Sequence, residues 1–179
     1  TVDMSDKRIT SVADPTGDQD AATKAYVDGV ASGLDVKDSV VAATTANLSG
    51  TYNNGTAGVG ATLTNSGTQA AFSIDGISPS QGDRILLKDQ SSAFQNGIYT
   101  LTTVGSGSAN WVLTRATDFN TVAKASPSSF TFVEQGTANG DNGFVFTHDS
   151  LSAVGTSGNN LTVAQFSGAG QVSAGNALT

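Results

Sequence analysis

The side chains that most often carry out enzymatic chemistry are scarce in this sequence. Its 179 residues include one histidine, His148, and no cysteine. A hydrolytic triad would have to combine His148 with a serine and a carboxylate such as Asp149 or Asp141, but no G-x-S-x-G nucleophile motif stands out. A zinc site needs several cysteine or histidine ligands. We therefore expect His148 to be a surface residue at a strand end, and we expect no zinc site.

Acidic side chains are a second candidate for chemistry, because sugar-cleaving enzymes use a pair of carboxylates. Such a pair is conceivable among six residues of the β-rich part of the chain: Asp83, Asp89, Asp118, Glu134, Asp141 and Asp149. Any acidic β protein offers pairs of this kind, so the pattern favours no particular pair. We therefore predict that the protein is not an enzyme, and we assign no catalytic residue.

Sites for metal ions and cofactors are not indicated either. The segment Asn139–Gly143 has oxygen ligands and glycines, but it lacks the full EF-hand pattern and its terminal glutamate. A tight turn is the simpler interpretation of this segment. The chain has no phosphate-binding loop of the Gly-Lys-Ser/Thr type. We predict no cofactor and no bound metal.

Composition argues against several classes of partner. The formal net charge is −7 and the isoelectric point is about 4.3. This acidity argues against binding to nucleic acids or to anionic membranes, since both need clusters of Lys and Arg. No apolar run approaches the roughly 20 residues that span a bilayer. We therefore expect no nucleic-acid binding and no membrane insertion.

The first secondary-structure element expected along the chain is a short helix. Residues 18–28 are the best helix candidate in the chain, because an aspartate at its start, Asp18 or Asp20, can accept hydrogen bonds from the first free amides. Ala22, Tyr26 and Val30 fall on one face at helical spacing. This small-residue face either packs on its own domain or forms a parallel bundle between identical chains.

The rest of the chain has the pattern of short strands separated by turns. Residues 82–101 predict a β-hairpin, because two runs of β-forming residues flank a polar loop that closes on Asn96-Gly97. Residues 129–148 predict a second hairpin, with two phenylalanines on one face of each strand: Phe130 and Phe132 on the first, Phe144 and Phe146 on the second. Further strands are expected near residues 36–43, 61–64, 71–77, 111–115 and 161–166. The strand at 71–77 has a turn at Asp75-Gly76, and the strand at 111–115 has Trp111, Leu113 and Arg115 on one face.

These elements predict a mainly β protein, with a short N-terminal α-helix followed by a small antiparallel β-sandwich or barrel. Residues 1–33 are the N-terminal extension and helix, residues 34–168 the β domain, and residues 169–179 a linker rich in Gly, Ala and Ser. Residues 49–67 are rich in turn formers and long for a loop in a compact domain. We interpret them as a spacer, with a contact surface as the alternative.

Two sets of motifs resemble segments of tailed-bacteriophage tail-fibre and tail-spike proteins. The first set lies between Arg8 and Asp28 and includes the sequence DAATKAYVD. The second is an ordered series in the β domain: GDRILLKDQ at Gly82–Gln90, NGIY at Asn96–Tyr99, Trp111, RATD at Arg115–Asp118 and FVE at Phe132–Glu134. Each motif is short, but their order and spacing together are fairly specific. The resemblance covers most of the chain and departs at Tyr52–Thr68, which is longer than the common form.

The resemblance implies a structural protein of the phage virion, located in the tail as part of a tail fibre, a spike or its adapter. It implies a homotrimer, with Ala22, Tyr26 and Val30 as the assembly residues near the threefold axis. Other tail or baseplate proteins are the implied partners, with a host-surface glycan as a further candidate. Attachment to the particle is favoured over receptor contact. The alternatives are a carbohydrate-binding or polysaccharide-degrading module and, third, a bacterial surface adhesin.

Overall fold

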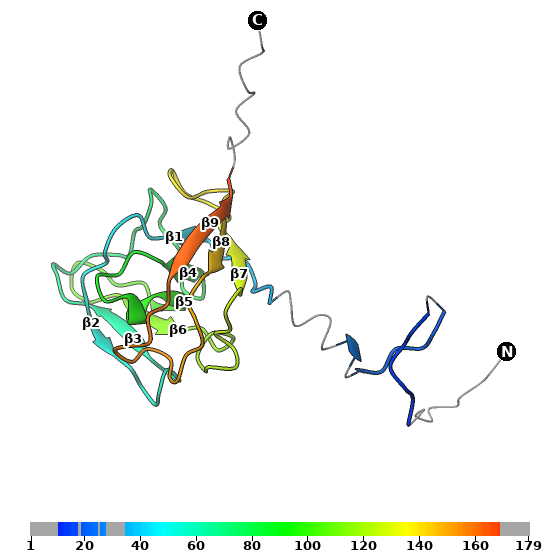
Figure 1. The fold of residues 1–179 in the computed structure, drawn as a ribbon. Coiled ribbons are helices and arrows are strands. Elements are labelled where there is room, and N and C mark those ends of the chain that lie inside the picture. The colour runs from blue at the N-terminus through cyan, green and yellow to red at the C-terminus, as the bar shows by residue number, and fades with distance from the viewer. Residues whose placement is uncertain (1–10, 18, 25, 28–34, 169–179) are drawn as a thin grey trace, which may run out of the picture. The chain divides into compact units, whose positions relative to one another are not determined.

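The computed structural model of the chain describes residues 11–17, 19–24, 26–27 and 35–168 (Figure 1). The chain divides into two compact units, Thr1–Asp35 and Val36–Thr179. All the strands of the described residues lie in the second unit, which we call the β unit.

The described part of the N-terminal unit contains one helical turn. Lys24, Tyr26 and Val27 are helical, and the N–H of Val27 donates to the carbonyl of Thr23 at 3.0 Å. The Thr23 hydroxyl accepts a hydrogen bond from the N–H of Tyr26 at 3.0 Å and so caps this turn. The predicted continuation of the helix to Val30 lies outside the described residues.

Asp20, one of the two predicted capping residues, has a different role. Its carboxylate accepts hydrogen bonds from the backbone N–H groups of Thr16 and Gly17, at 2.9 and 2.8 Å. These bonds, the one from Thr16 first, lower the pKa of the Asp20 carboxyl. Asp20 therefore closes the turn that precedes the helix and does not cap the helix itself.

Within the described residues, nine strands form two sheets (Figure 1). The six-stranded sheet has the order β1-β4-β5-β6-β3-β2, and the three-stranded sheet has the order β7-β8-β9. The elements are β1 (Ala42–Ala43), β2 (Gly50–Asn53), β3 (Thr62–Asn65), β4 (Arg84–Leu87), the 3-10 helix η1 (Ala93–Gln95), β5 (Gly97–Thr103), β6 (Val112–Arg115), β7 (Phe130–Phe132), β8 (Gly143–Phe146) and β9 (Val163–Ser167). The prediction of a mainly β protein is confirmed.

One extended stretch, which we call the linking segment (residues 36–43), joins the two sheets. Val36 and Val40 form parallel bridges beside β7, and the two residues of β1 then pair in parallel with β4. The predicted strand is therefore extended but changes partner half-way, so only β1 is regular strand. The other neighbouring strands pair antiparallel. A wholly antiparallel arrangement is wrong for this segment alone.

The six-stranded sheet is buried on both faces at β1, β4 and the start of β5, whereas β2, β3 and β6 have one face partly exposed. In β4, Leu86 lies in a core shared with the three-stranded sheet, while Ile85 and Leu87 lie in a second core on the opposite face. Burial on both faces explains why this strand is a continuous apolar run. The shared core consists of Val40, Ala43, Leu86, Ile98, Ala116, Phe119, Ala125, Val133, Phe144, Phe146, Val154 and Leu161. The second core consists of Ala42, Leu63, Phe72, Ile74, Ile85, Leu87, Tyr99, Leu101, Trp111 and Leu113.

The hairpin predicted at residues 82–101 is confirmed. β4 and β5 pair antiparallel from Arg84 opposite Thr100 to Leu87 opposite Gly97. In the hairpin predicted at residues 129–148, β7 and β8 likewise pair antiparallel.

The turn predicted at Asp75-Gly76 is confirmed, but the strand predicted around it, at residues 71–77, is not regular. Ile74 and Ile77 form only an isolated bridge. Between them, Asp75 and Gly76 have φ values of +50° and +78°, so the chain turns back on itself before a ladder can extend.

The stretch 49–67 is more ordered than a spacer. It contains β2 and β3, which pair antiparallel from Gly50 opposite Asn65 to Asn53 opposite Thr62. The turn between them is tied to a distant loop, because the Asn54 side chain donates to the carbonyl of Val154 at 3.2 Å. The interpretation as a mere spacer is therefore corrected to a hairpin of the six-stranded sheet.

Candidate functional site

The outer face of the three-stranded sheet carries exposed aromatic side chains. Phe130 and Phe132 of β7 stand opposite Val145 and Gly143 of β8. Residues directly opposite each other in a sheet share a face. The two phenylalanines therefore lie on the face of Val145, whereas Phe144 lies on the other face, in the shared core.

The two aromatic pairs of this hairpin are thus on opposite faces of the sheet. Phe144 and Phe146 are 4% and 0% exposed, while Phe132 is 46% exposed. The pairing of the strands is as predicted, but its register offsets the two pairs by one residue, and an offset of one reverses the face.

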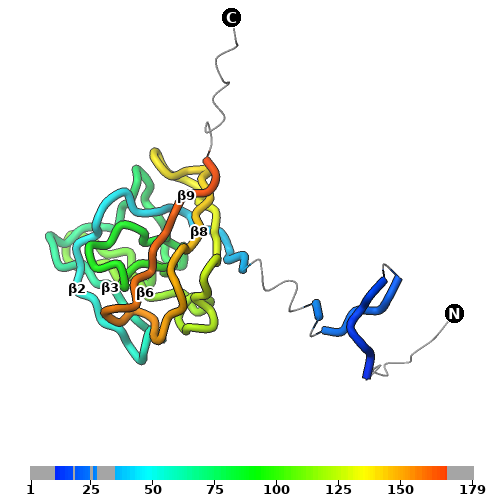
Figure 2. The backbone as a smooth tube through the Cα atoms, in the orientation of Figure 1, coloured from blue at the N-terminus to red at the C-terminus, as the bar shows by residue number. Residues whose placement is uncertain are grey.

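A third ring reaches the outer face from β9, which lies beside β8 (Figure 2). The register between these strands shifts between Gly143 and Phe144, so Phe166 is the extra residue of a β-bulge. Its ring lies over Gly143, because a Cβ added to that glycine would stand 2.6 Å from Cζ of Phe166. The glycine therefore makes room for the ring.

The three rings contact one another edge to face. Their centroids lie 6.1 Å (Phe130–Phe132), 5.6 Å (Phe130–Phe166) and 5.7 Å (Phe132–Phe166) apart, with interplanar angles of 86°, 80° and 68°. These are favourable aromatic geometries. Val145 stands opposite both Phe130 and Ala164. We call these five residues (Phe130, Phe132, Val145, Ala164 and Phe166) the aromatic face; none of them is ionisable.

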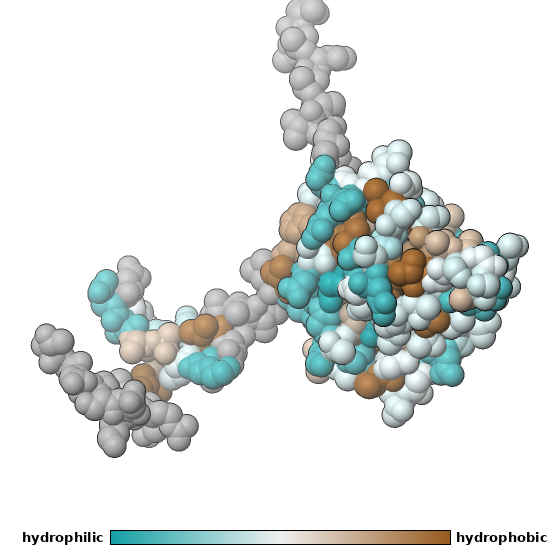
Figure 3. All heavy atoms as spheres, turned by 180° about the vertical axis from the view of Figure 1, so that it is seen from behind, coloured by the Kyte–Doolittle hydropathy of each residue, from teal (hydrophilic) through white to brown (hydrophobic). Residues whose placement is uncertain are grey.

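The exposure of this face makes it a candidate interaction site. Phe132 and Phe166 are 46% and 48% exposed, and Val36, which bridges to Phe130, is 59% exposed. On the side of the molecule drawn in Figure 3, polar and neutral side chains surround separate apolar areas, so an exposed apolar residue is not unusual here. The aromatic face differs because its rings contact one another, and contiguous exposed apolar groups mark contact surfaces.

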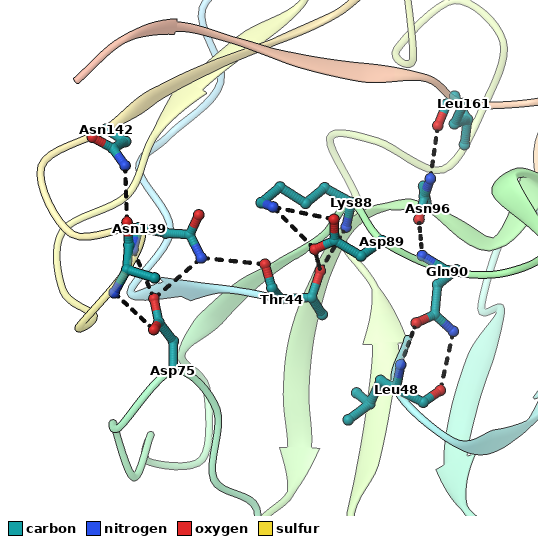
Figure 4. Close-up of polar contacts among 11 residues, drawn as sticks. Thr44, Leu48, Asp75, Lys88, Asp89, Gln90, Asn96, Asn139, Asn142 and Leu161 are labelled. Atoms are coloured by element: carbon teal, nitrogen blue, oxygen red, sulfur yellow. Dashed lines mark hydrogen bonds and ion pairs between the residues drawn. The ribbon is translucent and has the colours of Figure 1, made fainter. Parts of the chain in front are cut away.

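The polar side chains of the GDRILLKDQ and NGIY motifs bond within the β unit (Figure 4). Gln90 Oε1 accepts from the N–H of Leu48 at 2.8 Å, and Gln90 Nε2 donates to the Leu48 carbonyl at 3.2 Å. Asn96 Oδ1 accepts from the N–H of Gln90 at 2.9 Å, and Asn96 Nδ2 donates to the carbonyl of Leu161 at 3.0 Å. These amides therefore join the β4–β5 hairpin to the segments that lead into β2 and β9.

The charged end of the first motif is also held internally. Asp89 accepts from the Thr44 hydroxyl at 2.8 Å and from the Lys88 ammonium at 3.0 Å. The Lys88 ammonium lies 5.3 Å from the centroid of the Phe144 ring, which adds a cation–π contact. The motif residues thus connect the two sheets.

Arg115, the first residue of the RATD motif, is a buried cation. It is 2% exposed, and no carboxylate of the described residues pairs with it. Its Nη1 donates to the carbonyl of Asn96 at 2.9 Å, and its Nη2 donates to the hydroxyls of Tyr99 at 2.7 Å and Tyr52 at 3.3 Å. Burial, the main cause, raises the pKa of Tyr99. The alternation of residues 111–115 places Arg115 on the face of Trp111 and Leu113. The sequence makes Asp118 a candidate ion-pair partner of Arg115 or Arg84, and in the structure it pairs with Arg84.

The turn at Asn139–Gly143 is organised by a single carboxylate. Asp75 accepts from the N–H groups of Ala138 and Asn139, at 2.9 and 2.8 Å, and from Nδ2 of Asn139 at 3.1 Å (Figure 4). The predicted turn is confirmed, and its amide groups serve internal contacts. Within the ranges that the structure describes, no group of three or more His, Asp or Glu side chains is arranged to hold a metal ion.

Four of the six carboxylates considered for sugar cleavage, Asp89 among them, hold separate parts of the β unit. Asp118 forms a two-pronged ion pair with Arg84, at 3.1 and 2.8 Å. Glu134 accepts from the hydroxyl of Ser39. Asp83 accepts from a backbone amide in the turn before β4, at 2.8 Å. Each of these three, like Asp89, therefore has a structural contact of its own.

His148 is buried, so the expectation of a surface residue is wrong. It is 6% exposed and packs against the ring of Phe146, with centroids 6.1 Å apart. Its Nε2 lies 3.1 Å from the carbonyl of Ala125, which assigns the proton to Nε2. Burial, the main cause, lowers the pKa of His148, so the ring is neutral at pH 7. A backbone carbonyl thus orients the ring, in place of the carboxylate or serine of a catalytic triad.

A polar cavity of about 240 Å³ lies beside this histidine. It is lined by Thr147, His148, Asp149, Ser150, Leu151, Gly158, Asn159, Asn160 and Thr162. Part of its wall is fixed, because Asn159 Oδ1 accepts from the N–H and the hydroxyl of Ser152, at 2.8 and 3.0 Å. The lining offers hydroxyl and amide groups for a small polar ligand.

The predicted assembly residues of the N-terminal unit are partly described. Ala22 is exposed, Tyr26 is 39% exposed, and the neighbouring Val27 is 51% exposed. Val30 lies outside the described residues. None of the helices described in this chain is both long and apolar enough to cross a bilayer.

Comparison with known proteins yields no match: no family model, no curated protein and no solved structure is significantly similar to this chain.

Proposed function

We propose that this chain is a structural protein of a bacteriophage virion, part of a tail fibre, a tail spike or its adapter. It acts by contact, attaching to the particle and supporting adsorption to the host. It assembles as a homotrimer through its N-terminal helix, and its other partners are tail or baseplate proteins, with a host-surface glycan as a further candidate.

The proposal rests on the hydrogen bonds that the motif residues make within the β unit. Gln90, Asn96 and Asp89 bond to backbone and side-chain groups of the β unit. A motif whose polar groups form hydrogen bonds within the protein fits a structural role. An active site, by contrast, would leave polar groups directed at a substrate. The exposed apolar groups of the chain, Tyr26 in the N-terminal unit and the aromatic face in the β unit, fit a protein that acts through contact.

Absolute mass in solution, measured by light scattering across a dilution series, tests the assembly. We expect a stable mass of three chains. The double variant Ala22→Lys, Tyr26→Lys should lower this mass, because buried charges at a helix contact are costly. The unfolding of the β unit, followed by the fluorescence of Trp111, should not change. A wild-type mass of one chain, or an unchanged mass in the variant, contradicts the proposal.

The second candidate function is a carbohydrate-binding or polysaccharide-degrading module. It is favoured by the polar cavity beside His148, because hydroxyl and amide groups such as those of Ser150 and Asn160 suit the hydroxyls of a sugar. A glycan array tests it. Binding that is lost in Asn160→Ala, in a protein with an unchanged mass, would favour this candidate.

A further inference from the structure

We propose that the polar cavity beside His148 binds a single uncharged sugar residue through the hydroxyl groups of that sugar. The inference rests on the second candidate function, a carbohydrate-binding module, and names the class of ligand that its site takes. It does not depend on assembly through the N-terminal unit.

The size of the cavity limits it to one small ligand. Its volume is about 240 Å³, below the roughly 300–1,000 Å³ of pockets that hold drug-sized molecules. His148 is 6% exposed, whereas the other lining residues are exposed or half-buried, so His148 lies at the closed end. A cavity of this size holds one sugar ring and not a longer segment of a polysaccharide.

One amide donor in the lining is oriented but unused. Asn159 Oδ1 accepts hydrogen bonds from the N–H and the hydroxyl of Ser152, at 2.8 and 3.0 Å, and from the N–H of Ala153 at 3.3 Å. These bonds fix the side chain of Asn159, while its Nδ2 group donates to no acceptor of the described residues. A donor that is already oriented binds a ligand hydroxyl at a lower entropic cost.

An unpaired carboxylate lies in the same lining. Asp149 is exposed and has no hydrogen bond or ion pair with any residue that the structure describes. Burial lowers the pKa of His148, and the charge of Asp149 acts in the opposite direction, which places this carboxylate near the ring. A carboxylate is a strong acceptor for a ligand hydroxyl, because hydrogen bonds to charged groups are stronger than those between neutral groups.

The closed end of the cavity adds a second acceptor. Nε2 of His148 donates to the carbonyl of Ala125 at 3.1 Å, so Nδ1 of the neutral ring can only accept. Nδ1 is buried and has no hydrogen-bond partner in the part of the chain that the structure describes. Buried polar atoms are ordinarily paired with a protein group or with ordered water. A ligand hydroxyl at this end of the cavity supplies the donor, directly or through a water molecule.

This set of groups favours an uncharged polyhydroxy ligand. A hydroxyl both donates and accepts hydrogen bonds, so it can use the Asn159 donor and the Asp149 acceptor together. An ammonium group has no acceptor and leaves the Asn159 donor unused. An anionic ligand is repelled by Asp149, because none of the described residues that line the cavity is Lys or Arg. Leu151 provides an apolar contact for the C–H groups of the sugar ring.

Nuclear magnetic resonance tests this assignment, because His148 is the only histidine in the chain and its ring protons report on the closed end of the cavity. The full chain is titrated at about pH 7.5, where the ring is neutral, with the methyl glycosides of glucose, mannose and galactose. We expect at least one of them to shift the His148 signals saturably, with a dissociation constant on the order of 1 mM. No saturable shift with any of the three overturns the proposal.

Two chemically matched ligands test which property of the sugar is recognised. The fully O-methylated form of the bound glycoside has the same ring but no hydroxyl donor, and it should cause no saturable shift. The uronic acid of the same sugar, which carries a carboxylate in place of the CH₂OH group, should bind about fivefold more weakly. Equal binding of the O-methylated form, or of the uronic acid, overturns the proposal.

Two variants remove the ligand contacts one at a time. Asp149→Asn keeps the shape of the side chain and should raise the dissociation constant about tenfold. Asn159→Asp keeps the oxygen that accepts from Ser152 but replaces the Nδ2 donor with an acceptor, and it should raise the constant about fivefold.

The same two changes at exposed positions outside the lining, Asp38→Asn and Asn47→Asp, are the controls. Asn47 is a close match to Asn159, because its Oδ1 also accepts from a backbone N–H, that of Ser91, at 2.8 Å. Unfolding in urea, followed by Trp111 fluorescence, checks that every variant is folded. Equal dissociation constants in the cavity variants and their controls overturn the proposal.

This inference and the carbohydrate-binding candidate fail in different ways. Binding to the glycan array without a shift of the His148 signals places the sugar elsewhere on the chain and overturns this inference alone. No binding to the array and no shift in solution overturn both. The mass in solution, which tests the virion proposal, is independent of these outcomes.

Discussion

Replacing Gly97 with alanine tests whether the NGIY motif exists to accommodate a buried cation. Gly97 begins β5 with a φ of +137°, a conformation that L-residues rarely adopt. An added Cβ would lie 2.3 Å from Nη1 of Arg115 and 3.1 Å from Cδ1 of Phe119. Arg115 is 2% exposed, so its guanidinium cannot simply move into water. It would have to give up its hydrogen bond to the carbonyl of Asn96.

Two unfavourable contributions add in this variant. The backbone conformation costs about 1–3 kcal/mol once a side chain is present. Displacement of the guanidinium removes a hydrogen bond of a charged group, which is worth about 1.5–3 kcal/mol. We therefore expect Gly97→Ala to lower the free energy of unfolding by about 3–5 kcal/mol. For a chain of this size, that corresponds to a melting temperature lower by about 10 °C.

Urea unfolding followed by the fluorescence of Trp111 measures the loss, since Trp111 is the only tryptophan and is 7% exposed. Gly60→Ala is the control for backbone conformation alone, because Gly60 has a φ of +70° and an added Cβ would meet nothing within 4 Å. It should cost about 1–2 kcal/mol. Gly107→Ala, also in open space, should be close to neutral. If Gly97→Ala costs no more than Gly60→Ala, the reasoning about Arg115 is refuted.

Two further predictions concern side chains that hold the β unit together. Asp75→Ala removes the acceptor of three hydrogen bonds from Ala138 and Asn139 and should lower the free energy of unfolding, measured in urea, by about 2–3 kcal/mol. The exposed control Asp38→Ala should stay within about 0.5 kcal/mol of the wild type. Equal losses in both variants would contradict the role assigned to Asp75. Burial lowers the pKa of His148 below its ordinary value of 6.5, so the unfolded chain takes up this proton before the folded chain does as the pH falls. The contribution of this group to stability should therefore be fully present above pH 6.5 and should decrease as the pH falls from there toward the folded-state pKa. Urea midpoints measured at several pH values for wild type and His148→Gln check this, and an equal slope in both would count against it.

The parts of the fold that the sequence predicted are those with local signals. Asn96-Gly97 marked the loop of the β4–β5 hairpin, and the alternation of Trp111, Leu113 and Arg115 identified the buried face of β6. In each case a period of two residues or a turn-forming dipeptide is contained within a few residues of chain. The mainly β class follows from the same signals.

The candidate contact surface could not be predicted in this way, because it depends on register. In both β7 and β8, two phenylalanines are separated by one residue. A shift of one residue in the register between the strands decides which of the two pairs is buried. The position of Phe166 depends in addition on a bulge opposite Gly143. The burial of His148 depends similarly on a carbonyl 23 residues earlier, at Ala125. The residues next to these positions in the sequence do not predict any of these contacts.

The linking segment has a consequence for the order of events during synthesis. Val40 lies at the start of the β unit, but its bridge partner beside β7 is Val133, which leaves the ribosome about 90 residues later. At ordinary translation rates this delay is roughly 5–20 s. Until then residues 36–40 have no edge to pair with, although β1 can already pair with β4, and the side of β4 that faces the shared core stays uncovered. The β unit is therefore expected to fold as one cooperative body after its C-terminal hairpin has emerged, and the net charge of −7 opposes aggregation of the nascent chain in the interval.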